Sequence, residues 1–220
     1  MPGSTPSTLE TSQPQTSSSG TNGSVMKAVR LHAPGDVRCE EVPVPQIKPD
    51  EVLIKVQAVG ICGSDPARVM KKGTYSYPMT LGHEFSGEVV EVGRDVSGVT
   101  AGTRVTVAPL IPCHRCEYCQ VGSYQLCEDY SYYGSRTDGA LAEYVAVKAF
   151  NLIPLPDQVD YETGACTDPA AIALHAVRRS GLRVGDDFVV VGAGLIGLFA
   201  LQWARLMGAR RTVAIDVRSE

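Results

Sequence analysis

Four cysteines between residues 113 and 127 restrict the fold of this chain more than any other feature. They are spaced by three, three and eight residues, at Cys113, Cys116, Cys119 and Cys127. Each short spacing can direct two thiols to one point, and four thiolates around one Zn²⁺ make a closed tetrahedral site with no position for a substrate. Disulfides are the alternative, but no secretory signal accompanies these cysteines. We therefore expect a structural zinc site, with His114 as a bystander.

The composition narrows the class of protein. Hydrophobic residues make up 44% of the 220 residues, which suffices for one large or two small domains. A net charge of −4 gives no indication of nucleic-acid binding, and no apolar run approaches the length of a membrane span. Seven cysteines without a signal peptide predict a reducing compartment, the cytoplasm.

Residues 1–24 differ from the rest of the chain. They are mostly Ser, Thr, Pro, Gly, Gln and Asn, with Leu9 as their leucine and Glu10 as their charge. Such a segment cannot bury enough apolar surface to offset the entropy of ordering it. It lacks Lys and Arg, so a targeting peptide is not indicated. We expect a disordered tail.

Residues 25–156 have the pattern of a β domain. Short apolar or alternating segments recur between Gly and Pro residues, which predicts a barrel-like domain of many short strands. The cysteine loop is an insertion in this series. The expected strands are 27–31, 37–42, 52–59, 85–92, 103–107 and 140–147.

The spacing of the apolar residues changes in residues 157–220, where we expect a linker helix and an α/β unit. Asp168 and Pro169 have the residue types of a helix N-cap and first turn, and Gly181 follows the end of that helix. An apolar strand at 188–191, a helix to about Met207 and a second apolar strand at 212–215 make one β-α-β unit.

A glycine-rich turn follows the first strand of that unit. Its pattern is G-x-G-x-x-G at Gly192, Gly194 and Gly197, and the helix begins at Leu195 and Ile196. The glycines allow a tight turn, approach of a pyrophosphate to the helix N-terminus, and close helix–strand packing. Asp216 ends the next strand, where a carboxylate binds the ribose hydroxyls of NAD and repels the 2′-phosphate of NADP. Arg218 leaves some NADP use open.

A second set of metal-ligand types lies upstream. Cys62, His83 and Glu84 follow turn glycines at the ends of predicted strands. Thiolate, imidazole and carboxylate are the ligands of a catalytic zinc that keeps one position open. Spacing alone does not join Cys62 to His83, so a buried thiol and a hydrogen-bonded core histidine remain the alternatives.

Taken together, these motifs resemble the zinc-dependent medium-chain alcohol dehydrogenases from Met26 onward. The resemblance rests on the 62–65 and 82–84 segments, the cysteine loop and the glycine-rich turn, and it is greatest to the polyol branch through 77–87, 134–139 and 168–176. It implies a GroES-like β-barrel catalytic domain at 25–156 and, at 157–220, a linker helix and the first β-α-β of an incomplete Rossmann domain. It disfavours the zinc-free quinone reductases, because both sets of zinc ligands are present.

The resemblance also implies roles for single residues. Cys62 and His83 would bind the catalytic zinc, and Glu84 would enter or leave its shell. Asp168 stands where the polyol branch has a glutamate ligand; being shorter, it would ligate directly, bind through water or cap its helix. Asp65 would orient His83. His175 matches a family histidine, and its apolar helical surroundings favour a packing role.

The implied reaction is hydride transfer from a secondary alcohol of a polyol or polyol phosphate to NAD⁺. Zinc would act as a Lewis acid, and Ser64 would pass the hydroxyl proton towards solvent. A phosphorylated substrate would need a nearby cation, for which Lys71, Lys72 and Arg136 are candidates, although each alone has the character of a solvated loop charge.

The chain holds one of the two mononucleotide halves of a dinucleotide fold. We therefore expect the N-terminal part of a longer, homo-oligomeric enzyme with two zinc ions per chain. The alternative is a truncated zinc-binding module that catalyses nothing. Both strands of the α/β unit are apolar on each face, which predicts an exposed apolar surface here.

Overall fold

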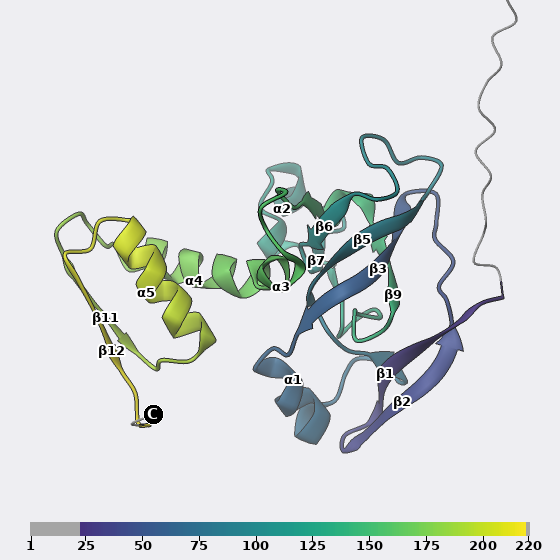
Figure 1. Ribbon diagram of the computed structural model, residues 1–220, viewed down its shortest axis with the longest axis horizontal. Coiled ribbons are helices and arrows are strands. Elements are labelled where there is room, and N and C mark those ends of the chain that lie inside the picture. The colour runs from purple at the N-terminus through teal and green to yellow at the C-terminus, as the bar shows by residue number, and fades with distance from the viewer. Residues whose placement is uncertain (1–22, 219–220) are drawn as a thin grey trace, which may run out of the picture.

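The computed structural model describes residues 23–218, so most of the tail expected at residues 1–24 lies outside it. A β-rich lobe is joined through helix α4 to a smaller α/β lobe (Figure 1). The strands of the β-rich lobe are β1 (Val25–Ala33), β2 (Asp36–Pro43), β3 (Glu51–Gly60), β4 (Met79–Thr80), β5 (Glu84–Val92), β6 (Arg104–Val107), β7 (Leu110–Ile111), β8 (Ser131–Tyr132), β9 (Tyr144–Lys148) and β10 (Leu152–Pro154).

The core of this lobe lies on an antiparallel sheet with the strand order β10-β6-β5-β3-β9. Alternate apolar residues of its strands meet in one cluster that includes Ile54, Phe85 and Val145. In β3, however, Val52, Leu53 and Ile54 are all fully buried. The second buried face exists because Leu53 packs with Met26 and Val44, beneath a separate sheet.

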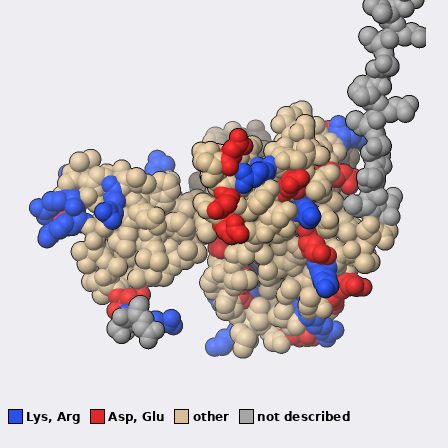
Figure 2. All heavy atoms as spheres, in the orientation of Figure 1, with Lys and Arg blue, Asp and Glu red and all other residues tan. Residues whose placement is uncertain are grey.

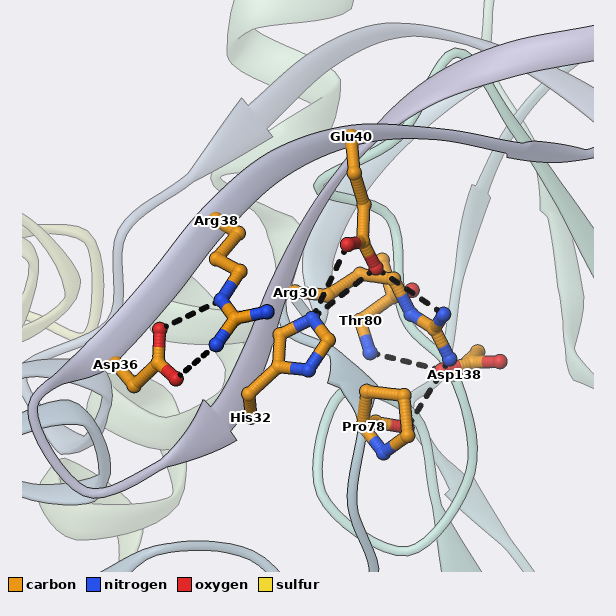
Figure 3. A network of polar contacts seen from close by, with 8 residues as sticks. All are labelled: Arg30, His32, Asp36, Arg38, Glu40, Pro78, Thr80 and Asp138. Atoms are coloured by element: carbon orange, nitrogen blue, oxygen red, sulfur yellow. Dashed lines mark hydrogen bonds and ion pairs between the residues drawn. The ribbon is translucent and has the colours of Figure 1, made fainter.

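That separate sheet has the strand order β2-β1-β4 and carries a polar network (Figure 3). Glu40 accepts a hydrogen bond from Arg30 at 3.3 Å and lies 3.1 Å from Nε2 of His32. Asp138 accepts a hydrogen bond from the backbone N–H of Thr80 at 2.8 Å. These contacts fix the segment after β8 against β4.

The cysteine loop lies between β7 and β8, which pair with each other and close its base. It contains helix α2 (Glu117–Gln120) and a 3₁₀ turn at Tyr124–Leu126. The side-chain amide of Asn151 donates to the carbonyls of Ala108 and Leu110, both at 2.7 Å. An insertion after residue 107, as the sequence predicts, is confirmed.

The chain crosses to the α/β lobe through α3 (Tyr161–Ala165) and α4 (Thr167–Arg179). There β11 (Asp187–Val191) and β12 (Arg211–Ile215) are parallel, and α5 (Leu195–Leu206) connects them. Buried Ala173, Val177, Ala200 and Ala204 lie between α4 and α5. Small side chains at this contact let the two helices approach closely.

The apolar surface expected on the α/β lobe is present. Val189 and Val191 are 54% and 84% exposed, and Val213 and Ile215 are exposed beside them. The visible face of this lobe carries few charged side chains (Figure 2). Among the helices of residues 23–218, none has the length and apolarity that crossing a bilayer requires.

Two sequence expectations about α4 are wrong. The helix begins at Thr167 with Cys166 as its N-cap, so Asp168 lies in the first turn and does not cap it. His175 is exposed, because α4 buries Ala173 and Val177 instead, and a packing role for this histidine is excluded. The predicted strand at 140–147 also begins late, since β9 starts at Tyr144.

Candidate metal centres and nucleotide site

The four cysteines of the loop converge. The Sγ atoms of Cys113, Cys116, Cys119 and Cys127 all lie within 4.8 Å of one another. Those of Cys113 and Cys119 are 3.9 Å apart. Tetrahedral zinc with Zn–S bonds of about 2.3 Å places its sulfurs roughly 3.8 Å apart, so this group fits that ion.

The backbone of the loop is arranged for thiolates. N–H groups of Arg115 and Cys116 lower the pKa of Cys113 to about 6, whereas burial raises the pKa of Cys119 to about 12. Four thiolates this close need a cation to offset their repulsion, and the chemistry of the set matches a divalent metal.

His114 does not belong to that group. It has a positive φ of 58°, and its ring packs 4.4 Å from the ring of Phe150 and 5.9 Å from that of Tyr124. The imidazole thus joins the loop to the segment after β9 by ring contacts, which agrees with the expectation of a bystander.

A second group consists of Cys62, His83 and Glu84, whose ligand atoms also lie within 4.8 Å of one another. The pairing of β3 with β5 explains their meeting. Gly60 at the end of β3 lies opposite Glu84 at the start of β5, so Cys62, two residues beyond, reaches the same place. Sequence spacing does not reveal a contact made by antiparallel pairing.

Asp65 supports this group differently from the expectation. Its Oδ2 accepts a hydrogen bond from the backbone N–H of Cys62 at 3.0 Å, while its Oδ1 is 3.9 Å from Nδ1 of His83. The longer distance is not a hydrogen bond. Oδ1 is buried without a partner among the described residues. Asp65 therefore fixes Cys62 in this structure, and orientation of His83 by a hydrogen bond is not observed.

Acidic groups surround the second group. Burial raises the pKa of Glu84, although the hydrogen bond with Cys62 and the charge of His83 oppose this shift. Burial also raises the pKa of Asp168, opposed by His83. Asp168 is thus close enough to act electrostatically on the site but does not belong to the three-residue group. A divalent cation would offset this accumulation of carboxylates.

Sequence reasoning missed Tyr132. Its ring packs edge-on against His83 with 5.5 Å between centroids. Burial and the charges of Asp168, Cys62 and Glu84 raise its pKa, and Arg68 opposes this shift. Tyr132 lies in β8, at the end of the cysteine loop, and no motif marks it.

The glycine-rich turn has the geometry that the sequence predicts. Gly192 has a φ of 103°, and Gly194 precedes α5 as its N-cap. A Cβ atom at Gly197 would collide with the carbonyl oxygen of Gly192, so the third glycine is required for packing. Leu195 and Ile196 open α5, where unpaired N–H groups favour an anion.

Asp216 lies against this turn. Its Oδ2 accepts a hydrogen bond from the backbone N–H of Ala193 at 2.6 Å, and its Oδ1 accepts one from that of Arg218 at 3.0 Å. N–H groups of Arg218 and Ala193 lower the pKa of Asp216. The carboxylate therefore stays ionised at the end of β12, beside the turn.

Comparison with known proteins places this arrangement in a family. The model of the alcohol dehydrogenase GroES-like domain matches residues 48–157, which include both groups of candidate metal ligands, whereas Asp168 lies beyond the matched range. The chain belongs to the alcohol dehydrogenase GroES-like domain family. This agrees with the resemblance to zinc-dependent medium-chain dehydrogenases.

Two relatives of this alcohol dehydrogenase-like chain are named as dehydrogenases of a polyol or a polyol phosphate. It is 42% identical over 196 residues to galactitol 1-phosphate 5-dehydrogenase of Escherichia coli K12, covering 89% of this chain and 57% of the relative. It is 41% identical over 196 residues to sorbitol dehydrogenase of Bombyx mori, covering 86% and 56%. The chain thus spans a little more than half the length of these curated relatives.

A solved structure shares its fold. The NADP-bound crystal structure of a putative zinc-binding dehydrogenase from Sinorhizobium meliloti 1021 aligns with a TM-score of 0.83 and 41% identity. The alignment covers 87% of this alcohol dehydrogenase-like chain and 56% of that one. The names of the two curated relatives agree with the polyol branch predicted from the sequence, whereas the name of this solved structure states no substrate.

Proposed function

We propose that this protein is a zinc-dependent oxidoreductase that transfers hydride from a secondary alcohol of a polyol or polyol phosphate to NAD⁺. The observation that carries the proposal is the meeting of Cys62, His83 and Glu84 within 4.8 Å, with His83 and Glu84 buried. Three different ligand types at one point are typical of a catalytic zinc, in contrast to the all-sulfur group of the loop.

Each zinc would have its own residues. Cys113, Cys116, Cys119 and Cys127 would hold a structural ion, and Cys62, His83 and Glu84 a catalytic one. The catalytic ion supplies Lewis acidity, which lowers the pKa of a substrate hydroxyl. Asp168 stays a candidate for an additional ligand, direct or through water, because its partly buried carboxylate acts on His83.

Residues of the chain would prepare this site. Asp65 holds the backbone N–H of Cys62 at 3.0 Å and so fixes the direction of its thiol. The backbone N–H of Ser64 lies 3.5 Å from Sγ of Cys62, so Ser64 is next to the group. We assign Ser64 the transfer of the substrate proton towards solvent.

The glycine-rich turn would hold the dinucleotide. Gly194 allows the pyrophosphate to approach the N-terminus of α5 at Leu195 and Ile196, and Gly192 and Gly197 shape the turn. The cofactor would accept the hydride. Asp216 favours NAD over NADP because its carboxylate repels a 2′-phosphate.

The cellular setting is part of the same proposal. All seven cysteines are free thiols within residues 23–218, and metal binding by the loop requires reduced thiols, which supports a cytoplasmic location. We expect a homo-oligomer at the protein's native length, with small-molecule polyols as its substrates.

Turnover by the purified protein at its native length tests the proposal. NADH formation with galactitol 1-phosphate, galactitol and sorbitol is followed for wild type and Cys62→Ser. We expect turnover in wild type and loss of at least about 1,000-fold in the variant, because a ligand of the Lewis acid is lost. Zinc bound to the loop without any turnover would instead support the zinc-binding module.

A further inference from the structure

Arg68 is a half-buried cation without a counter-ion. It opens the π-helical turn at Arg68–Lys72, directly after helix α1 (Ser64–Ala67). Its Nε atom is buried and has no hydrogen-bond acceptor within residues 23–218, and no carboxylate in that part of the chain forms an ion pair with it. A buried N–H group of a cation without an acceptor is costly, so this arginine is expected to meet an anion.

The position of Arg68 relates it to the candidate catalytic group. Its charge acts on Tyr132, the tyrosine whose ring packs 5.5 Å from that of His83. The short helix α1 begins two residues after Cys62, so Arg68 and the thiol come from one continuous segment. The charge of Arg68 and the acidic groups of the site therefore act on the same tyrosine.

Arg136 is a second arginine without an acidic partner among the described residues. Its guanidinium lies 4.1 Å from the ring centroid of Tyr75 and 4.4 Å from that of Tyr130. Two aromatic faces hold the planar group and leave its N–H edges free, because stacking uses the faces of the guanidinium. The stacking already restricts the rotamers of Arg136, so a bound phosphate would lose less free energy in ordering this side chain.

The loop that carries Arg136 is also fixed. The backbone N–H of Arg136 donates to the carbonyl of Tyr132 at 2.9 Å, and that of Tyr75 donates to the carbonyl of Ser135 at 3.4 Å. Asp138 is bound to the N–H of Thr80 (Figure 3). Arg136 thus contacts Tyr132 through the backbone, and the charge of Arg68 acts on the same tyrosine.

Neighbouring cations differ from this pair. Arg30 is neutralised by Glu40 at 3.3 Å (Figure 3), and Lys71 and Lys72 are exposed on the π-helical turn. Of the cations named from the sequence for phosphate recognition, Arg136 is the one with a fixed side chain. Arg68 was not among them, because only the structure shows that its Nε is buried.

We propose that Arg68 and Arg136 form an anion subsite that receives the phosphate of a polyol monophosphate, so that the protein prefers phosphorylated over unphosphorylated polyols. The inference rests on the proposed function and names its substrate class. A guanidinium matches a phosphate through paired N–H···O bonds, and a second cation from another segment closes around the same group. The hydroxyl to be oxidised then reaches the site of Cys62 and His83.

The test compares substrates rather than absolute rates. For the zinc-loaded protein at native length, kcat/KM is measured with galactitol 1-phosphate and galactitol, and their ratio is compared in wild type, Arg68→Gln, Arg136→Gln and Lys72→Gln. We expect each arginine variant to lower the ratio by about 10- to 100-fold, as the loss of a hydrogen bond to a charged group does. Lys72→Gln, a matched charge removal at an exposed position, should keep it.

A binding measurement separates this inference from the proposed function. Calorimetry with galactitol 1-phosphate, galactitol and inorganic phosphate reports the subsite even if no substrate is oxidised. Equal affinity of wild type for galactitol 1-phosphate and galactitol, or an unchanged difference in both arginine variants, would overturn the subsite. So would tighter binding of galactonate than of galactitol 1-phosphate, since a carboxylate would then be the recognised anion.

Misfolding of one variant does not remove the test. Circular dichroism and zinc content check each protein, and Arg136 is exposed, so Arg136→Gln is expected to fold. Tyr75→Leu removes one face of the aromatic clamp without changing charge, and we expect a smaller fall in the phosphate preference. An unchanged preference in both Arg136→Gln and Tyr75→Leu contradicts the role of the clamp.

Discussion

Gly60 and Glu84 lie opposite each other across β3 and β5, and a Cβ atom at residue 60 would lie 2.7 Å from Oε2 of Glu84. The absence of a side chain on one strand therefore makes room for a buried carboxylate on the other. The pairing of Gly60 with Glu84 places Glu84 beside Cys62, so the register of the main sheet determines the position of the candidate catalytic zinc ligands.

Gly60→Ala should displace the Glu84 carboxylate and weaken metal binding at that group by about tenfold or more, as changes beside metal ligands do. The measurement is competition for zinc with a chelator of known affinity. Gly35→Ala is a poor control because Gly35 has a positive φ, so Ala58→Gly, in the same strand, serves instead. Equal zinc affinity of Gly60→Ala and wild type would show that Glu84 does not need this space.

Two glycines of the nucleotide turn should respond differently to alanine. At Gly197 a Cβ would collide with the Gly192 carbonyl, so Gly197→Ala should destabilise the fold by about 1–3 kcal/mol. At Gly194 a Cβ meets nothing within 4 Å, so Gly194→Ala should cost less than about 1 kcal/mol. It should nevertheless weaken NAD binding, because the methyl group occupies the space through which the pyrophosphate approaches.

Denaturant unfolding and NAD titration of the native-length protein separate these effects. Normal NAD affinity in a folded Gly194→Ala variant would contradict the placement of the pyrophosphate at the start of α5.

Asp216→Ala should shift cofactor preference towards NADP by more than about tenfold, since removal of the carboxylate removes its repulsion of the 2′-phosphate. The ratio of kcat/KM for NAD⁺ and NADP⁺ measures this preference. Asp186→Ala is the control, because it removes an exposed carboxylate at the opposite end of the same two strands, bonded to the N–H of Arg183. A wild type that already prefers NADP⁺ would show that attraction of the 2′-phosphate by Arg218 outweighs its repulsion by Asp216.

The contact of Lys148 with Asp50 and Glu51 joins β9 to the start of β3, at 2.9 Å and 3.0 Å. A hydrogen bond from Lys148 lowers the pKa of Asp50. Burial alone would lower the pKa of Lys148, but its hydrogen bonds to Asp50 and Glu51 outweigh burial, so the pKa of Lys148 is raised. Stability from Asp50 is present above its ordinary pKa of about 3.9 and is lost as pH falls through the lowered value. Stability from Lys148 is present below about 10.4 and is lost as pH rises through the raised value.

Lys148→Met should therefore lower the free energy of unfolding by about 0.5 kcal/mol at pH 7, a small value because solvent screens the pair. The difference from wild type should narrow at both pH extremes. Lys55→Met, at an exposed position of neighbouring β3, should show no such pH dependence. A difference that is constant with pH would assign the effect to packing.

The sequence predicted much of this structure because its signals are local. Alternation identified β3, cysteine spacing identified the loop, and three glycines identified the turn before α5. Contacts made by pairing of distant strands were not accessible in this way. The meeting of Cys62 with His83 required the resemblance to a family, and Tyr132 was missed altogether.

Side-chain environments were also beyond the sequence. Asp168 has the residue type of an N-cap, but α4 starts one residue earlier, at Thr167. His175 lies in an apolar sequence, yet its side chain is exposed, while Ala173 and Val177 of the same helix pack in the buried contact with α5. Residue type and period do not determine which face of a helix is buried when its neighbour comes later in the chain.

Zinc stoichiometry tests the central claim most directly. Native mass spectrometry of the purified protein at its native length should find two zinc ions per chain in wild type and one in Cys62→Ser, because the four-cysteine group is unaffected. A single zinc in wild type, or two retained in Cys62→Ser, would contradict a second metal site at Cys62, His83 and Glu84.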